Sequence, residues 1–241
     1  MRNSDQHDLV ARAESYPYDV RDDAFTFRAG RADPFEPDLL AGRTAILAIG
    51  SNGAPLRLTT KFGGVDEIVP VMSARLANHA VVYAATITGY GSIPATFVPA
   101  AGATALVALT FLTDDQLARM HASEALGQHY ELVDVTASVQ PETPWAAMGT
   151  VLAYRNLFGP LHVNAQPLRL AEVPTVGTRF GAAYQSGLLT LLHHHFGRPD
   201  ETYAGFITDL VANLPRRLAI RDAMGEGLMT RPRMRAGATQ A

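Results

Sequence analysis

The sequence predicts a mixed α+β fold with a barrel-like sheet, one core helix and a helical C-terminal extension. Three observations support this. Short apolar segments bounded by turn residues recur between residues 41 and 156, which is typical of strands. One segment within that region, residues 114–125, has helical spacing instead. After residue 157 the apolar spacing becomes helical, so helices are expected to follow a strand-rich core.

The elements of the core follow from these patterns in chain order. Thr113 and Gln116 have the spacing of a capping box, which predicts a helix that begins at Asp114. Strands are expected near residues 44–49, 67–72, 79–88, 94–98, 104–112, 129–136 and 149–154.

The chain is divided into four regions. Residues 1–40 are polar and are expected to form an N-terminal arm with little structure of its own, packed on the body through aromatic side chains. Residues 41–156 form the core. Residues 157–225 form a loop and helical extension, with one helix stopped at Gly197 and Pro199 and a second one starting near Thr202. Residues 226–241 are expected to be a disordered tail.

Composition excludes several classes of function. The chain has 241 residues with 47% hydrophobic content, enough for a substantial core. It has no cysteine, which excludes disulfides, thiolate metal sites and a cysteine nucleophile, and fits a reducing compartment. The net charge of −3 argues against a nucleic-acid partner. No apolar run approaches the roughly 18–20 residues of a membrane span, and the first residues lack the apolar core of a signal peptide. We therefore expect a cytoplasmic protein without a membrane partner.

The first candidate site segment is a strand that ends in a tight turn. Apolar residues run from Thr44 to Ile49, and Gly50-Ser51-Asn52 with Gly53 follow. Glycines make positive φ angles accessible, and consecutive backbone N–H groups in such a turn can converge on an anion or a carbonyl oxygen. Ser51 and Asn52 add side-chain hydrogen-bonding groups. The same residues also occur in ordinary turns, so both interpretations are open.

The second candidate is Glu124. In the predicted helix, Leu117, Met120, His121 and Glu124 share one side, since they are three or four residues apart. A carboxylate aligned with Leu and Met is expected to be partly desolvated, which would raise its pKa and suit general acid–base chemistry. The alternative is a surface glutamate near a frayed helix end. The consecutive residues 193–195, all His, do not predict a metal site, because neighbouring helical residues point about 100° apart.

In this order, the two segments resemble the gamma-glutamylcyclotransferase-like family. Its members have a strand ending in Tyr-Gly-Ser-Asn, where this chain has Ile49-Gly50-Ser51-Asn52. They carry a catalytic Glu in a Leu-Asp-x-x-Glu-Gly segment, where this chain has residues 120–125 with Glu124. A Tyr follows at the start of another strand, which corresponds to Tyr130. The resemblance covers residues 41–156. Two residues depart from it: Ile49 stands in place of Tyr, and Ala125 in place of Gly.

The resemblance implies a reaction and the residues that perform it. Backbone N–H groups of the loop, Ile49 to Asn52, would polarise the γ-amide carbonyl of a small-molecule substrate with a γ-glutamyl group. Glu124 would move a proton from the substrate's α-amine to the leaving amine, and Tyr130 would form a pocket wall. The products would be 5-oxoproline and an amine. No metal or cofactor is implied.

Two other functions stay open at this point. One is an amide hydrolase on the same fold, in which Glu124 activates water. The other is a non-catalytic binding or accessory module, which the departures at Ile49 and Ala125 would favour, as would an exposed Glu124 or a pocket plugged by the extension. The extension is expected either to cover the pocket or to mediate self-association into a homo-oligomer. The sequence does not identify the leaving amine.

Overall fold

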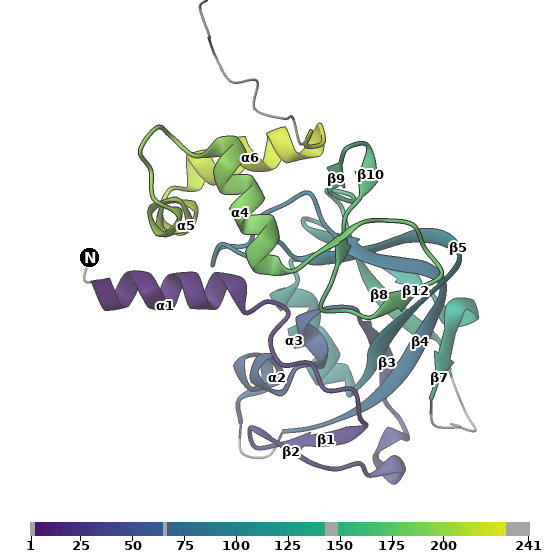
Figure 1. Cartoon of the computed structure of the whole chain (residues 1–241). Helices are drawn as coiled ribbons and strands as arrows, with labels where there is room; N and C mark the ends of the chain where they lie inside the picture. The colour runs from purple at the N-terminus through teal and green to yellow at the C-terminus, as the bar shows by residue number, and fades with distance from the viewer. Residues whose placement is uncertain (1–2, 65–66, 143–148, 230–241) are drawn as a thin grey trace, which may run out of the picture.

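Two long antiparallel strands form the centre of the fold in this computed structural model (Figure 1), which describes residues 3–64, 67–142 and 149–229. Strand β4 spans Ile68–Tyr83 and β5 spans Ala95–Leu112. They pair from Val71↔Thr110 to Tyr83↔Ala95, with an irregularity between Ala77 and His79. The sequence predicted two shorter strands in place of each. That was wrong because each strand continues past the irregularity, and β4 and β5 pair with each other on both sides of it.

The remaining strands extend this pair into a mixed sheet. Strand β3 (Thr44–Ala48) is antiparallel to β5 and parallel to β8 (Val151–Asn156), and β6 (Tyr130–Asp134) is antiparallel to β8. The main path runs β13-β11-β4-β5-β3-β8-β6. Over the described residues this path does not close on itself, so the predicted α+β class is confirmed but its barrel-like detail is not. The shorter strands are β7 (Val139–Pro141), β9 (His162–Val163), β10 (Gln166–Pro167), β11 (Arg169–Leu170), β12 (Thr175–Val176) and β13 (Ala182–Ala183).

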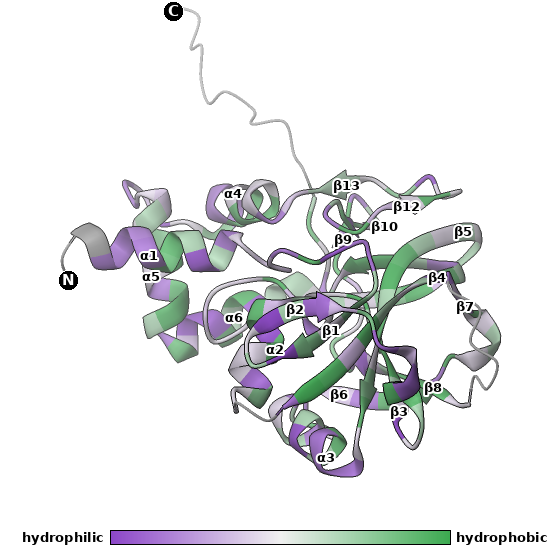
Figure 2. Ribbon diagram, turned by 90° about the horizontal axis from the view of Figure 1, so that it is seen from below, coloured by the Kyte–Doolittle hydropathy of each residue, from purple (hydrophilic) through white to green (hydrophobic). Residues whose placement is uncertain are grey.

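Apolar residues alternate between the two faces of the sheet and build two cores. Along β3, Ala45 and Leu47 belong to one core, whereas Ile46 and Ala48 belong to the other. This alternation follows from the two-residue period of a strand. Helices α2 (Pro55–Phe62) and α3 (Asp114–Ser123) contribute to the second core. The central strands are hydrophobic in Figure 2, whereas α3 presents hydrophilic residues to its outer side.

The N-terminal forty residues have more structure than expected. Helix α1 spans Asn3–Glu14, β1 spans Phe25–Arg28, β2 spans Arg31–Pro34, and a 3-10 turn η1 covers Pro37–Leu40. The expectation of a largely unstructured arm was therefore wrong. The physical reason is that β1 pairs along its length with β4 and buries two phenylalanines of this segment against the second core. The expected packing on the body is confirmed for Phe25 and Phe27, whereas Tyr18, the third aromatic residue expected to pack, is only half-buried.

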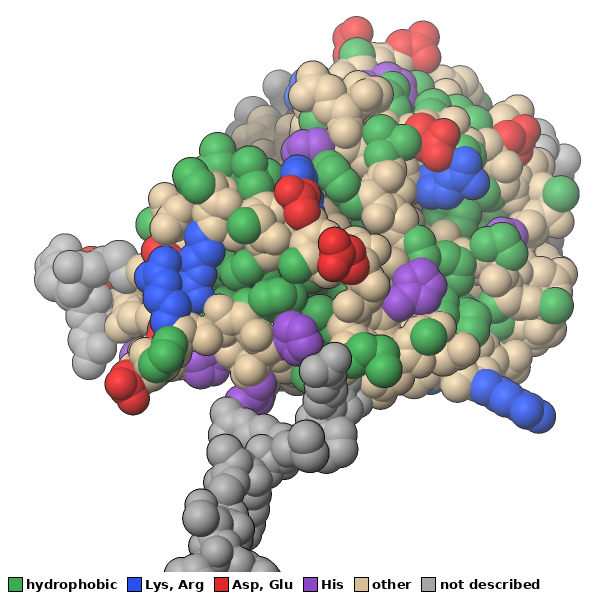
Figure 3. All heavy atoms as spheres, turned by 90° about the horizontal axis from the view of Figure 1, so that it is seen from above, with side chains coloured by type: hydrophobic (Ala, Val, Ile, Leu, Met, Phe, Trp, Pro, Cys, Tyr) green, Lys and Arg blue, Asp and Glu red, His purple; other side chains and the backbone are tan. Residues whose placement is uncertain are grey.

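The C-terminal extension forms three helices beside α1 (Figure 1). Helix α4 spans Gln185–Phe196, α5 spans Tyr203–Ala212 with the expected cap at Thr202, and α6 spans Leu214–Gly225. Pro215 lies in the first turn of α6, where a backbone N–H has no acceptor within the helix and its absence costs nothing. The face formed by these helices carries basic side chains next to hydrophobic ones (Figure 3). Over the described residues, no helix combines the length and apolar character needed to cross a membrane.

The start of the expected disordered tail is ordered. Leu228 is buried, its N–H donates to the His162 carbonyl at 2.8 Å, and its own carbonyl accepts from Asn164. Residues 226–229 therefore belong to the folded body. The rest of the predicted tail, residues 230–241, lies outside the described residues.

Candidate active site

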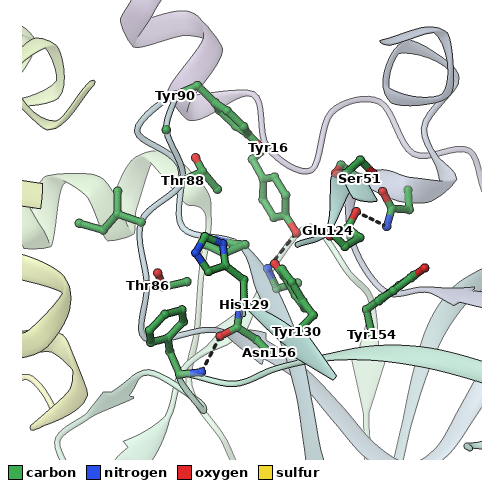
Figure 4. A pocket seen from close by; sticks show the side chains of 18 of the residues that line it. Tyr16, Ser51, Thr86, Thr88, Tyr90, Glu124, His129, Tyr130, Tyr154 and Asn156 are labelled. Carbon is green, nitrogen blue, oxygen red and sulfur yellow. Dashed lines mark hydrogen bonds between the residues drawn. The ribbon is translucent and has the colours of Figure 1, made fainter. Parts of the chain in front are cut away.

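A cavity of about 340 Å³ lies where the end of β3 faces α3, β6, β8 and α6 (Figure 4). Every site residue predicted from the sequence lines it: Ile49, Gly50, Ser51, Asn52, Glu124 and Tyr130. Residues that are far apart in the sequence thus line the same cavity. Within the described part of the chain, no group of three or more His, Asp or Glu side chains is placed to hold a metal ion.

The turn after β3 forms one wall of the cavity. Strand β3 ends at Ala48, and a 3-10 turn η2 covers Ser51–Gly53 directly before α2. The first N–H groups of such a turn have no acceptor within it, so they are available to a ligand. Gly50 has φ −148°, so the turn does not use the positive φ that its glycines were expected to provide. Glycine is needed for another reason: a Cβ at Gly50 would collide with the hydroxyl of Tyr16.

Tyr16 reaches the cavity from the N-terminal region. Its side chain is buried, and its hydroxyl accepts a hydrogen bond from the Ala95 N–H at 2.8 Å (Figure 4). Burial raises the pKa of Tyr16 well above its usual value, and nearby Tyr130 adds to the rise. Ile49, which also lines this cavity, has neither an aromatic ring nor a hydroxyl. Tyr16 supplies both to the same wall, and sequence reasoning missed it because no local pattern links residues 16 and 50.

Glu124 occupies the end of α3. The capping box of Thr113 and Gln116 is present, as predicted, and it fixes the start of the helix. The helix ends at Ser123, and Glu124 is its C-cap residue with its N–H bonded to Met120 O at 3.0 Å. The Glu124 side chain is only 12% exposed. The predicted partial desolvation of this carboxylate is therefore confirmed.

The residue after Glu124 has an unusual backbone conformation. Ala125 has a left-handed backbone with φ 49°, a conformation that glycine adopts without strain and L-residues do not. A helix C-terminus commonly places glycine at this position. The alanine therefore stores local strain next to Glu124, and the backbone still makes the turn toward β6.

Two side chains hold the Glu124 carboxylate. Lys61 Nζ forms an ion pair with Glu124 Oε1, and Asn52 Nδ2 donates to the same oxygen at 3.2 Å. The Lys61 side chain is 3% exposed, and its Nζ also lies 2.9 Å from Met120 Sδ. Burial lowers the pKa of Lys61, and the neighbouring Glu124 partly opposes this.

Lys61 is the functional candidate that the sequence analysis missed. It follows the buried Leu58 by three residues in α2, which turns its side chain from solvent toward α3. It is also the only lysine of the chain. A lone lysine on the inner side of an amphipathic helix could have been flagged, but nothing in the sequence identifies its partner 63 residues away.

Tyrosines form most of the floor. Tyr130 begins β6, and its ring meets that of Tyr154 edge to face with centroids 6.4 Å apart. Burial, followed by the charge of Glu124, raises the pKa of both hydroxyls, so both are neutral donors at ordinary pH. The Tyr154 hydroxyl bonds to His121 Nδ1 at 2.7 Å. His121 is thus a half-buried polar residue bonded to Tyr154, and no bond joins it to Glu124.

Arginines supply the remaining charge. Arg57, Arg217 and Arg221 line the cavity, and Glu124 is its only lining carboxylate among the described residues. Arg57 lies one helical turn before Lys61, and its Nε is buried without a hydrogen-bond partner. A buried donor without an acceptor is destabilising, and a bound anion would satisfy it.

The fold and the site define an α+β protein with a cavity lined by a largely buried carboxylate, Glu124, which pairs with Lys61 behind the cavity wall. No protein-family model matches the sequence, and no curated protein matches it. Several solved structures resemble it, and three of them cover about half of this chain. A protein from Arabidopsis thaliana is 20% identical with TM-score 0.37, covering 48% of this chain and 70% of its own. A gamma-glutamyl cyclotransferase is 16% identical with TM-score 0.38, covering 47% and 66%. An uncharacterized protein from Homo sapiens is 16% identical with TM-score 0.39, covering 47% and 66%. Similarities of this extent do not define an activity, which must be argued from the residues of the site.

Proposed function

We propose that this protein cleaves a γ-glutamyl amide by attack of the substrate's own α-amine, giving 5-oxoproline and a free amine. The observation that carries the proposal is the Glu124 carboxylate, which is held by Lys61 and Asn52 inside a cavity that also presents the Gly50–Ser51 turn. A base near the nucleophile and N–H donors near the carbonyl are what this reaction needs.

The chemistry assigns a role to each wall. The Ser51 and Asn52 N–H groups would polarise the γ-carbonyl and stabilise its developing negative charge. Arg57, with its unpartnered buried Nε, would bind the α-carboxylate of the γ-glutamyl head. Glu124 would accept the proton of the α-amine and deliver it to the nitrogen that leaves. Because the nucleophile belongs to the substrate, correct orientation supplies much of the rate enhancement.

The condition of Glu124 favours an active site over a non-catalytic module. That alternative would be supported by an exposed Glu124 or by a pocket filled by the extension. The carboxylate is 12% exposed, and the cavity has room for a substrate of amino-acid-conjugate size.

Product analysis tests the proposal. Purified protein is incubated with a panel of γ-glutamyl compounds, and 5-oxoproline is measured by mass spectrometry. We expect its release and a loss of roughly 10²–10⁴-fold in the Glu124→Gln variant, as for removal of a general acid–base group. Arg155→Gln, at an exposed site on β8, is the control and should keep full activity. Release of glutamate instead of 5-oxoproline would identify a hydrolase. Full activity of Glu124→Gln would contradict the mechanism.

A further inference from the structure

We infer that Tyr16 is a catalytic residue of the proposed reaction, and that its hydroxyl donates a hydrogen bond to the γ-carbonyl oxygen as that oxygen becomes negative. This inference rests on the proposed function, because it adds a catalytic group to the same cavity. The donor comes from the N-terminal region, residues 1–40, which precedes the core. The position of the hydroxyl, its hydrogen bonding and the elements that hold it all support this role.

The Tyr16 hydroxyl lies directly against the turn that follows β3. A Cβ at Gly50 would collide with the hydroxyl oxygen, so this oxygen sits over the Gly50 Cα. The next backbone nitrogen along the chain is that of Ser51, whose N–H group is one of the two assigned to the γ-carbonyl oxygen. A carbonyl oxygen bound at this turn would therefore lie within reach of the tyrosine as well.

The hydroxyl has a proton available to donate. Its oxygen accepts from the Ala95 N–H at 2.8 Å, which leaves the O–H group free to act as a donor. Within residues 3–64, 67–142 and 149–229, this O–H group has no acceptor. Tyr16 is only 5% exposed, and a buried donor without an acceptor is destabilising. An oxygen of a bound substrate would satisfy it.

The hydroxyl is also close to the group that transfers the protons. The Tyr16 ring extends from beside Tyr90 toward Glu124 and Tyr130 (Figure 4). Burial is the main cause of the raised pKa of Tyr16, and the charge of Glu124 adds to it. A phenol with a raised pKa stays protonated at ordinary pH, so Tyr16 serves as a hydrogen-bond donor and Glu124 as the base.

Tyr16 acts on the intermediate, and its own proton is not transferred. The α-amine nitrogen forms a bond to the γ-carbon, the carbonyl π electrons move to the oxygen, and Glu124 takes the proton that the amine releases. When the carbonyl forms again, the bond from the γ-carbon to the leaving nitrogen breaks, and that nitrogen receives the proton from Glu124. The hydrogen bond from Tyr16 strengthens while the oxygen is negative, which lowers the barrier.

Helix α1 holds Tyr16 in this position. The helix ends at Glu14, whose Oε1 accepts from the Tyr203 hydroxyl of α5 at 2.7 Å. Ala13 is fully buried in the first core, to which Tyr16 also belongs. A donor that is fixed before the substrate binds needs little reorganisation in the transition state. The helical extension therefore contributes to the site by holding α1 and, through it, Tyr16.

Removal of this hydroxyl alone tests the inference. Tyr16→Phe keeps the ring but cannot donate. For the γ-glutamyl compound of the panel that is turned over fastest, we expect kcat to fall roughly 100-fold, as for loss of one oxyanion donor, while KM changes less than about threefold. Tyr83→Phe is the matched control, because the buried Tyr83 hydroxyl donates to the Ala183 carbonyl at 2.9 Å and Tyr83 does not line the cavity. This control should keep the wild-type kcat.

Binding of a tetrahedral mimic separates a catalytic role from a structural one. The probe is a glutamate analogue in which a methylphosphinate replaces the γ-carboxyl group, because it carries an anionic oxygen on a tetrahedral centre as the intermediate does. We expect its Kd, measured by calorimetry, to rise in Tyr16→Phe by about the factor by which kcat falls, and to be unchanged in Tyr83→Phe. The stoichiometry of the titration counts the folded sites, so partial unfolding cannot imitate the result.

The inference and the proposed function can fail separately. Full kcat in Tyr16→Phe overturns the inference while the proposed function stands. Equal losses of kcat in Tyr16→Phe and Tyr83→Phe, with unchanged phosphinate binding, also overturn it, because they indicate a structural role. If the wild type releases no 5-oxoproline from any compound of the panel, the proposed function fails. Weaker phosphinate binding in Tyr16→Phe would then still support Tyr16 as a donor to an anionic oxygen, and unchanged binding would overturn both.

Discussion

The ion pair between Lys61 and Glu124 makes a quantitative prediction about folding. Both side chains are largely buried, with exposures of 3% and 12%. Removing one partner of a buried pair leaves an uncompensated charge, which costs about 3 kcal/mol or more, whereas removing both can be neutral. We therefore expect Glu124→Gln to lower the free energy of unfolding by about 3 kcal/mol. Lys61→Met with Glu124→Gln should restore it, since the methionine would pack beside Met120.

The pH dependence follows from the direction of the Lys61 shift. Its pKa is lowered in the folded protein, so the unfolded chain binds this proton more tightly. Stability then rises with pH as pH passes above the folded pKa toward the unfolded value near 10.5. Glu124 partly opposes the lowering, so Glu124→Gln should widen this range. The free energy of unfolding of Glu124→Gln should rise by up to about 1.4 kcal/mol per pH unit within that range. The double variant, which has no Lys61, should show no such rise.

The free energy of unfolding is measured by urea denaturation at pH 7 and pH 9 for four proteins. They are the wild type, Lys61→Met, Glu124→Gln and the double variant. The double-mutant cycle should give a coupling energy of about 3 kcal/mol, far above the roughly 0.5 kcal/mol expected of independent sites. Lys61→Met alone should also impair turnover, because Glu124 loses a partner that holds its carboxylate in position. Additive changes in the cycle, or a Glu124→Gln variant as stable as wild type at pH 7, would refute the reasoning.

Three further predictions concern the surroundings of the site. Ala125→Gly should raise stability by about 1 kcal/mol by relieving the left-handed strain, which is about 2–4 °C in Tm for a chain of this size; an unchanged Tm in a thermal melt would contradict it. Gly50→Ala should lower the free energy of unfolding by about 1–3 kcal/mol through overpacking against Tyr16. In urea unfolding, the loss should be smaller when Gly50→Ala is combined with Tyr16→Phe, which removes the colliding hydroxyl. Arg216 lowers the pKa of Glu201 to about 2, so the stability it adds is present above pH 4.5 and is lost as pH falls toward 2. Arg216→Met should lower the free energy of unfolding by about 2 kcal/mol at pH 7, allowing for solvent screening. In urea unfolding between pH 5 and pH 2, the free energy of unfolding of this variant should fall less with pH than that of the wild type.

The sequence predicted those parts of the site that depend on local patterns. The capping box at Thr113 and Gln116 fixed the phase of α3, and that phase placed Glu124 on the inner side. The strand and turn that carry Gly50 were likewise visible as an apolar run followed by turn residues. Both inferences need only periodicity over a few residues, which a single sequence contains.

The remaining parts depend on packing between distant segments. The hydrogen bond of Tyr16 spans 79 positions, and the ion pair of Lys61 spans 63. The two long strands were divided in the prediction because polar residues interrupt β4, and Pro99 and Gly102 interrupt β5, although the two strands pair on both sides of these interruptions. The strand propensity of a short segment predicts its boundaries poorly where pairing with distant strands determines them.

Tyr16 brings a hydroxyl to the part of the cavity that Ile49 lines. An isoleucine at the end of β3 cannot donate or accept a hydrogen bond, so a polar pocket edge requires a group from elsewhere. Tyr16 approaches the Cα of Gly50, which only glycine permits, and its hydroxyl is fixed by the Ala95 N–H. The site is thus completed from both sides of the core region, by a tyrosine preceding it and by arginines of α6 following it.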